Sequence, residues 1–169
     1  MRRIGFFALV GLVLLAIMGS QAYSSNTKEK VKEKLNIRNS IKTTLTGKHE
    51  VPPTTSNATG TADFRINKDS TTINYTLHVS NLADITGAHV HYGMADSTGP
   101  VVVNLFTGPA KTGPFTGNLA KGAITAADLG GPLQGKTIAD FLAAAKAGNL
   151  YVNVHTTANP NGEIRGQLK

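Results

Sequence analysis

The stretch Ile73-Asn74-Tyr75-Thr76-Leu77-His78-Val79-Ser80 alternates apolar and polar side chains with a period of two. This period is typical of a β-strand with one buried face, because successive side chains of a strand point to opposite sides. Residues 62–67 alternate in the same way, and the short polar segment 68–70 separates the two runs. We therefore expect an antiparallel hairpin in this part of the chain.

Similar short runs continue towards the C-terminus, with turn residues between them. The further strands that we expect are residues 88–92, 101–105, 151–155 and 164–168, the last two joined by the turn Asn159-Pro160-Asn161-Gly162. Short strands separated by turns indicate an antiparallel β-sandwich or barrel.

One helix is expected to interrupt the strands. Thr137-Ile138-Ala139-Asp140 has the form of a capping box, an apolar stripe follows it, and Gly148 is placed to end the helix. A shorter helical turn is expected over 125–129. The predicted fold class is therefore mainly β, with one short helical insertion that covers one end of the sheet.

Length and composition restrict the classes of function. The chain has 169 residues, enough for one ordinary domain, and it contains no Cys. This excludes disulfides, thiolate metal sites, Fe–S clusters and a Cys nucleophile. The formal net charge is +7, but much of it lies near the N-terminus. The remainder lacks a basic patch interleaved with exposed aromatic residues, so we expect no nucleic-acid partner.

The N-terminus has the three parts of a signal peptide. Arg2 and Arg3 precede an apolar run over 4–18, and Ser20-Gln21-Ala22 places small residues at the cleavage positions. The run is shorter than the roughly 20 apolar residues of a spanning helix. We predict a signal peptide over 1–22 and a secreted or cell-surface protein. The alternative is that the segment is not cleaved and anchors the protein in a membrane. The protein would then contact the membrane through this segment alone.

A charged segment follows the signal peptide. Residues 23–42 carry six Lys or Arg side chains against two Glu, and their apolar positions are sparse. We interpret 23–42 as a charged tether and 43–169 as the folded domain. The alternative for the tether is a basic arm that binds a surface.

Three histidines are placed where they could act together as metal ligands. His89 and His91 are two residues apart in a predicted strand, so they project from the same face, with Ala88 and Val90 directed to the core. His155 lies in another predicted strand and is also opposite to that strand's core-facing valines. If the two strands are neighbours, the three imidazoles meet on the outer face of the sheet. Three imidazoles with an open position suit one copper or zinc ion.

Each of these assignments has a plainer alternative. His89, His91 and His155 can be exposed strand residues with no shared partner. His78 is on the polar face of its own strand. It can be a fourth ligand, a group behind the ligands or simply a solvated side chain. His49 lies in an irregular stretch and is a weaker candidate.

Other chemistries find less support in the sequence. We find no phosphate loop, no G-x-S-x-G motif and no H-E-x-x-H motif. Glu163 and Arg165 flank Ile164 and are expected to face outward, as a surface ion pair or as a charged rim that steers an anion to a metal. Asn57 and Asn74 match the glycosylation sequon, which also occurs by chance.

Together these segments resemble the CHRD (chordin-type) domain family over about residues 43–169. The resemblance implies an extracytoplasmic β-sandwich of Greek-key type. It implies little about biochemistry, because in chordin the domain is one module of a larger secreted regulator. The matching segments are Leu45-Thr46-Gly47, Glu50-Val51-Pro52-Pro53, Gly60, Ala88-His89-Val90-His91, Gly99, Tyr151-Val152-Asn153-Val154-His155-Thr156 and Asn159-Pro160-Asn161-Gly162-Glu163-Ile164-Arg165-Gly166-Gln167-Leu168.

The two His-bearing strands are also similar, more distantly, to the copper-ligand strands of Cu,Zn superoxide dismutases. That similarity implies that His89, His91 and His155 are copper ligands and that Arg165 guides the anion. The chain departs from that family because it lacks the disulfide Cys pair, a His and Asp cluster for zinc, and a bridging His. A mononuclear copper site agrees better with these departures than a two-metal site.

The sequence thus supports three hypotheses on function. The first is an exported CHRD domain that binds one copper or zinc ion through the three histidines. The second is a metal-free cell-surface or extracellular module that binds another protein. The third is a copper-only oxidoreductase similar to superoxide dismutase, although we lean against an enzyme.

Overall fold

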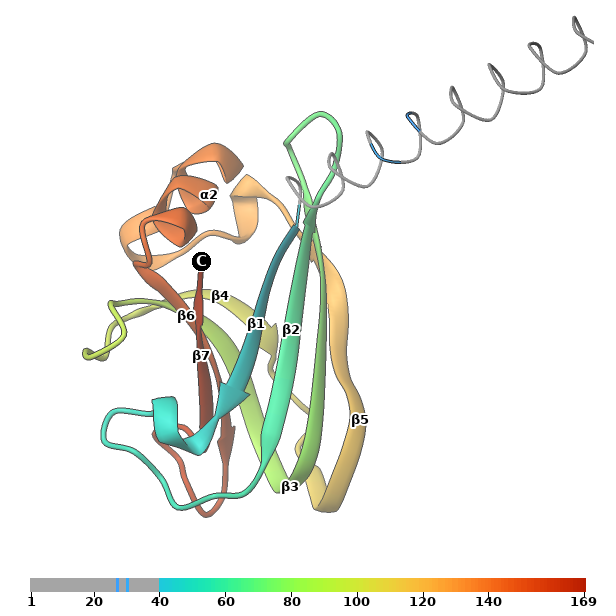
Figure 1. Cartoon of the computed structure of the whole chain (residues 1–169), viewed down its shortest axis with the longest axis vertical. Coiled ribbons are helices and arrows are strands. Elements are labelled where there is room, and N and C mark those ends of the chain that lie inside the picture. Colours follow the sequence, from blue (N-terminus) through green and yellow to red (C-terminus); the bar gives the residue numbers. More distant parts are fainter. Residues whose placement is uncertain (1–26, 28–29, 31–39) are drawn as a thin grey trace, which may run out of the picture. The chain divides into compact units, whose positions relative to one another are not determined.

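The computed structural model describes residues 27, 30 and 40–169, and Figure 1 shows its fold. The predicted signal peptide and most of the predicted tether lie outside the described residues. Among those that are described, no helix has the length and hydropathy needed to cross a membrane. The folded unit contains the elements β1 (Ser40–Thr46), η1 (Gly47–His49), β2 (Thr59–Ile66), β3 (Ile73–Tyr92), β4 (Val101–Phe106), β5 (Lys111–Ile124), η2 (Ala126–Asp128), η3 (Gly131–Leu133), α2 (Ile138–Lys146), β6 (Leu150–Thr156) and β7 (Ile164–Leu168).

All strand pairs are antiparallel, and the sheet closes on itself. Its order is β2-β1-β7-β6-β3-β4, and the additional pairing of β2 with β3 closes β2, β1, β7, β6 and β3 into a barrel. Strands β4 and β5 pair with β3 outside this ring. The mainly β fold class predicted from the sequence is therefore confirmed. Apolar side chains on the inner faces of the strands fill the barrel, among them Leu45, Phe64, Leu77, Val90 and Val154, each fully buried.

The long strand β3 organises the barrel. Its first half pairs with β2 and β5, and its second half pairs with β4 and β6. The sequence pattern predicted two separate strands here, over 73–80 and 88–92. The structure joins them because Leu82 and Ile85 continue the buried side, while Asn81 and Asp84 take positive φ angles at the irregularities that bend the strand.

Two further boundaries differ from the sequence prediction. Strand β1 begins at Ser40, so the last residues of the predicted tether are in the sheet, where Ile41 is buried. Strand β5 was not predicted, because most of its side chains are exposed and its sequence contains Pro114 and several glycines. Strand β5 pairs with β3 outside the closed ring, and few of its side chains are buried.

The helix forms where its capping box predicted it. The Thr137 hydroxyl oxygen accepts a hydrogen bond from the Asp140 backbone N–H, and the Asp140 carboxylate accepts one from the Thr137 backbone N–H. Phe141 is buried with its ring centroid 6.4 Å from that of Phe64. Helix α2 thus covers one end of the barrel, as Figure 1 shows.

Candidate metal site

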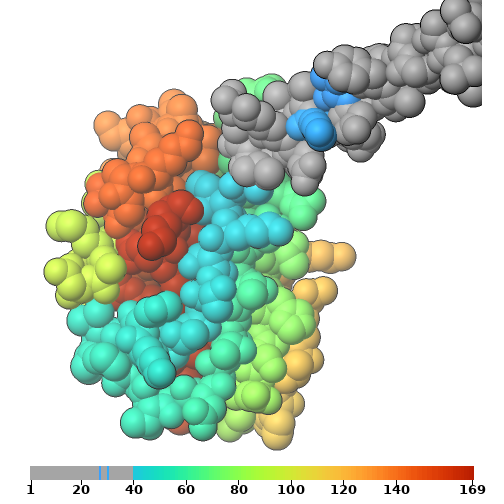
Figure 2. Space-filling view, in the orientation of Figure 1, coloured from blue at the N-terminus to red at the C-terminus, as the bar shows by residue number. Residues whose placement is uncertain are grey.

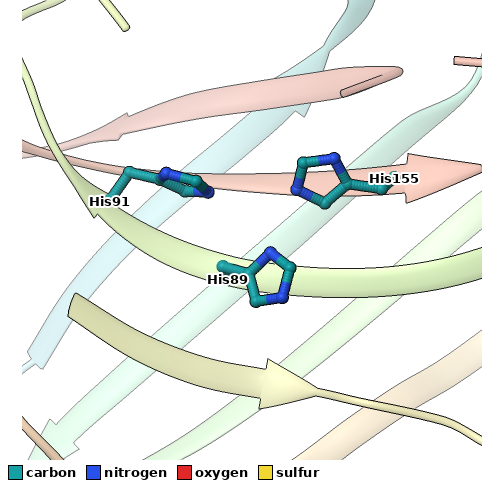
Figure 3. A group of neighbouring side chains, drawn as sticks. All are labelled: His89, His91 and His155. Carbon is teal, nitrogen blue, oxygen red and sulfur yellow. The ribbon is translucent and has the colours of Figure 1, made fainter. Parts of the chain in front are cut away.

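Strand pairing brings the three predicted histidines together. In the ladder between β3 and β6, His89 is opposite Asn153, His91 is opposite Tyr151, and His155 is opposite Gly87. The alternate side chains of both strands fill the barrel. The three His rings therefore share its outer face and point towards a common space, which Figure 3 shows.

The rings are close enough to share one ion. The ring centroid of His89 is 4.9 Å from that of His155 and 5.6 Å from that of His91, and the other two centroids are 6.0 Å apart. One nitrogen atom from each ring lies within 4.8 Å of the others. Two nitrogens that bind one ion at about 2.0–2.1 Å are at most about 4.2 Å apart, so small ring rotations complete the geometry. This group can hold a metal ion.

Backbone carbonyls set the tautomers of two of the rings. Nδ1 of His91 is 2.9 Å from the Gly99 carbonyl oxygen, and Nδ1 of His155 is 3.0 Å from that of Pro160. Because a carbonyl only accepts, both Nδ1 atoms carry the proton and both Nε2 atoms keep a free lone pair. Those two Nε2 atoms and Nδ1 of His89 are buried and have no hydrogen-bond partner in the described chain. Each ring therefore has one buried nitrogen that is available as a ligand.

Burial keeps the three imidazoles neutral. Desolvation is the main cause that lowers the pKa of His89 from 6.5 to about 4, and the charges of His155 and His91 lower it further. Desolvation also lowers the pKa of His91 and of His155, although the hydrogen bonds to Gly99 and Pro160 partly oppose this. A neutral imidazole is the form that binds metals.

The loop between β3 and β4 covers part of this outer face. The carbonyl oxygen of Gly99 in this loop accepts the hydrogen bond from Nδ1 of His91. The backbone N–H of Gly99 donates to the Tyr151 hydroxyl at 3.3 Å. As a result His91 is only 8% exposed, and His89 and His155 are half-buried. The sequence prediction placed the rings on the outside of the barrel but did not foresee this cover.

Arg165 differs from its predicted setting. The sequence predicted that it faces outward with Glu163, but Arg165 is 1% exposed. Its Nη2 atom donates to the carbonyl oxygens of Met94 at 2.6 Å and Ser97 at 2.9 Å, and its guanidinium lies 3.4 Å from the Tyr151 ring centroid. The predicted surface ion pair is therefore wrong. A side chain that holds the covering loop from beneath is poorly placed to guide anions from solvent.

Glu163 also has a structural role. Its carboxylate accepts hydrogen bonds from Ser56 at 2.7 Å, Thr156 at 2.6 Å and Asn159 at 3.1 Å. These contacts connect the segment after β1 to the turn between β6 and β7. The turn in turn supplies the Pro160 carbonyl that orients His155.

The other predicted candidates lie outside the group. His78 is exposed in the first half of β3, and the three-His group does not include it. His49 is exposed in η1, and the sequon residues Asn57 and Asn74 are also exposed. Sequence reasoning named Glu50 only as part of a family segment and did not predict its burial, although this carboxyl is 6% exposed. The burial could not be predicted locally, because it comes from distant segments.

These observations define a class of protein, an antiparallel β-barrel with three histidines on the outer side of neighbouring strands. Residues 41–168 match the family model of the CHRD domain. The chain therefore belongs to the CHRD domain family, as its motifs indicated, and this supports a module of extracellular type. Neither a search of curated proteins nor one of solved structures found a match. The similarity to superoxide dismutase remains a prediction.

Proposed function

We propose that this chain is an exported CHRD domain that binds one copper ion through Nδ1 of His89, Nε2 of His91 and Nε2 of His155. The observation that carries the proposal is that each ring offers one buried nitrogen without a partner, and the three converge. An unpartnered buried polar atom costs about 1–3 kcal/mol, so three in one place favour an ion that satisfies them together.

The general affinity order of divalent metals favours copper over zinc. Imidazole nitrogens suit both ions, and no thiolate is present in the chain. For a given set of nitrogen ligands, Cu(II) binds more tightly than Zn(II) in the general affinity order of divalent metals. Three protein ligands also leave a coordination position for water or another small molecule.

The surrounding residues support the proposed ligands. The carbonyls of Gly99 and Pro160 hold two rings in the tautomer that presents Nε2, which is the usual role of groups behind metal-binding histidines. Ligands on paired strands are also held rigidly, because the ladder of β3 and β6 fixes their spacing.

Titration calorimetry of untagged protein with Cu(II) and with Zn(II) tests the proposal. We expect one Cu(II) per chain, tighter than Zn(II), and at least a 100-fold loss in the variant His89→Ala/His91→Ala/His155→Ala. The matched control is His78→Ala, which removes an exposed imidazole of the same barrel and should leave affinity unchanged. Circular dichroism establishes that each variant is folded. Equal Cu(II) binding by the triple variant would exclude the site.

Family membership by itself supports a second candidate, a metal-free interaction module at the cell surface or outside the cell. Metal analysis of protein purified without a His tag separates the two. The second candidate requires that neither copper nor zinc co-purifies and that neither ion raises the melting temperature.

A further inference from the structure

Asn153 is the polar residue that lies between the three proposed ligands. It is opposite His89 in the ladder of β3 and β6, and His155 follows it by two residues on the same face of β6. His91 is the next outer-face residue of β3 after His89, so it is diagonal to Asn153. The outer-face position of Asn153 is therefore adjacent to those of all three histidines.

The Asn153 carboxamide is buried and carries an oxygen atom without a partner. The residue is 2% exposed, and its Oδ1 has no hydrogen-bond partner in the described chain. Figure 2 shows that segment 47–58, which connects β1 to β2, lies over part of β7, the strand next to β6. An acceptor that is buried without a partner is unfavourable. Asn153 Oδ1 thus shares this condition with one nitrogen of each neighbouring imidazole.

Contacts at the two ends of the carboxamide show which end faces the histidines. Nδ2 is directed to the turn between β6 and β7, where it donates to the Asn161 carbonyl oxygen at 3.5 Å. A Cβ at Gly162 in the same turn would lie 2.8 Å from this Nδ2. Burial lowers the pKa of His91, and the Asn153 side chain is among the groups that oppose this, which is the effect of an acceptor close to the ring. The oxygen end of the carboxamide is therefore directed to His91.

Asn153 Oδ1 and His91 Nε2 are both acceptors in the metal-free protein. Because Nδ1 of His91 donates to the Gly99 carbonyl, Nε2 carries a lone pair, and an amide oxygen carries lone pairs only. Two acceptors cannot satisfy each other, and neither atom has another partner in the described chain. A cation bound by both atoms satisfies both.

We propose that the carboxamide oxygen of Asn153 is a fourth ligand of the copper ion and that it makes the site selective for Cu(II) over Cu(I). The inference rests on the proposed function. The oxygen takes the coordination position that water would otherwise occupy beside the three nitrogens. Cu(II) favours tetragonal sites of nitrogen and oxygen ligands, whereas Cu(I) is selected by soft sulfur ligands. Three imidazole nitrogens and one amide oxygen match the oxidised ion.

Paired measurements of Cu(II) and Cu(I) affinity in Asn153→Leu test this inference. Leu has a similar size but no donor atom, so we expect Cu(II) to bind about 10-fold more weakly, while Cu(I) affinity stays within about twofold. Competition against chelators of known affinity gives both values, with Cu(I) measured anaerobically in the presence of ascorbate. The matched control is Asn104→Leu on β4, which is also opposite His89 but is exposed. It should leave both affinities within about twofold.

Asn153→Asp is a second variant, which keeps the size of the side chain and an oxygen atom at the ligand position. It should bind Cu(II) at least as tightly as the unaltered protein, and it decides the question if circular dichroism shows that the Leu variant is not folded. A Cu(II) loss in the Asp variant would overturn the inference.

Two further outcomes separate this inference from the proposed function. If the unaltered protein binds one Cu(II) and the Leu variant keeps the same ratio of Cu(II) to Cu(I) affinity, the fourth ligand is excluded and the three-His site stands. If the unaltered protein binds no Cu(II), both the proposed function and this inference are overturned.

Discussion

The phenol ring of Tyr151 lies parallel to the imidazole of His91, with the ring centroids 4.9 Å apart and the planes 7° from parallel. The guanidinium of Arg165 packs 3.4 Å from the centroid of the same phenol ring. Tyr151 therefore connects a proposed ligand to the side chain that holds the covering loop. Tyr151 is not a proposed ligand itself, but its packing against the imidazole can control the orientation of His91.

Substitution of Tyr151 tests this control. Tyr151→Leu removes the stacking on His91, and we expect copper affinity to fall about 10-fold, the lower end for groups behind metal ligands. Tyr151→Phe keeps the ring and loses only the hydroxyl that accepts from Gly99, so affinity should change less than about threefold. Competition against a chelator of known affinity measures both. Unchanged affinity in the Leu variant would show that the stack does not orient the ligand.

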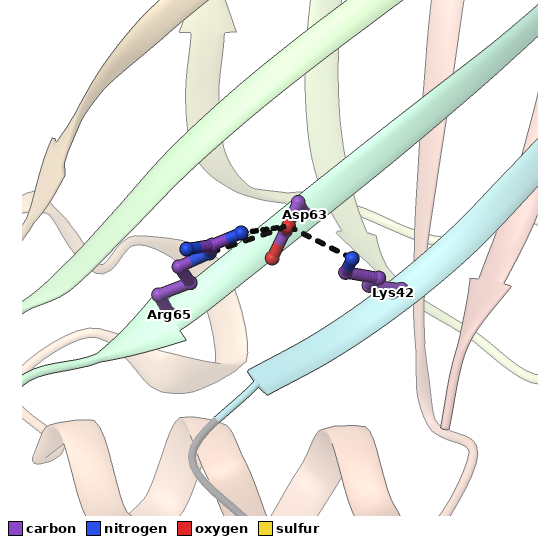
Figure 4. A network of polar contacts seen from close by, with 3 residues as sticks. All are labelled: Lys42, Asp63 and Arg65. Carbon is purple, nitrogen blue, oxygen red and sulfur yellow. Dashed lines mark hydrogen bonds and ion pairs between the residues drawn. The ribbon is translucent and has the colours of Figure 1, made fainter. Parts of the chain in front are cut away.

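Arg165 should matter mainly for stability. Arg165→Lys cannot satisfy the Met94 and Ser97 carbonyls together, and it loses the flat contact with Tyr151. We expect the free energy of unfolding to fall by about 2–4 kcal/mol, from the cost of disrupting a buried hydrogen-bonded charge. The control is Arg65→Lys, at an exposed arginine paired with Asp63 (Figure 4), where solvent screens the ion pair and the change should be much smaller. Urea unfolding of both variants measures the difference.

The barrel was predictable because most of its strands carry local information. Alternation marks 73–80 and 164–168, and the capping box marks the helix. Alternation also placed His89, His91 and His155 on one side of their strands. It could not show that β3 and β6 are neighbours, because strand pairing depends on the whole chain. The burial of Arg165 and Glu50 was missed for the same reason, since distant loops cover them.

Gly162 is expected to be intolerant of a side chain. Its φ is +128°, and a Cβ there would collide with the Glu50 carboxylate and lie 2.8 Å from Nδ2 of Asn153. We expect Gly162→Ala to lower the free energy of unfolding by about 3 kcal/mol, from backbone strain and overpacking together. Gly135→Ala is the matched control, with φ of +72° and no atom within 4 Å, and strain alone should cost it about 1 kcal/mol. Equal losses would show that the contacts around Gly162 can relax.

The buried His89 should make the metal-free protein less stable in acid. Its pKa is lowered from 6.5 to about 4, so between these values the unfolded chain binds a proton that the folded chain does not. Stability from this group is fully present above pH 6.5 and is lost as the pH falls towards 4. Relative to His89→Gln, the protein should lose about 2 kcal/mol of its free energy of unfolding over this range, allowing for partial exposure. Urea unfolding at several pH values gives this difference, and a pH-independent difference would contradict it.

Glu50 should act in the opposite direction. Its pKa is raised from 4.5 to about 7, so the folded chain holds a proton in this range that the unfolded chain releases. The stability that Glu50 contributes is fully present below pH 4.5 and is lost as the pH rises through 7. The protein should therefore lose stability relative to Glu50→Gln on going from pH 4.5 to 7, while it gains stability relative to His89→Gln over the same interval. Because the two slopes have opposite signs, the same unfolding series separates them. Parallel slopes for the two variants would contradict the buried settings of both residues.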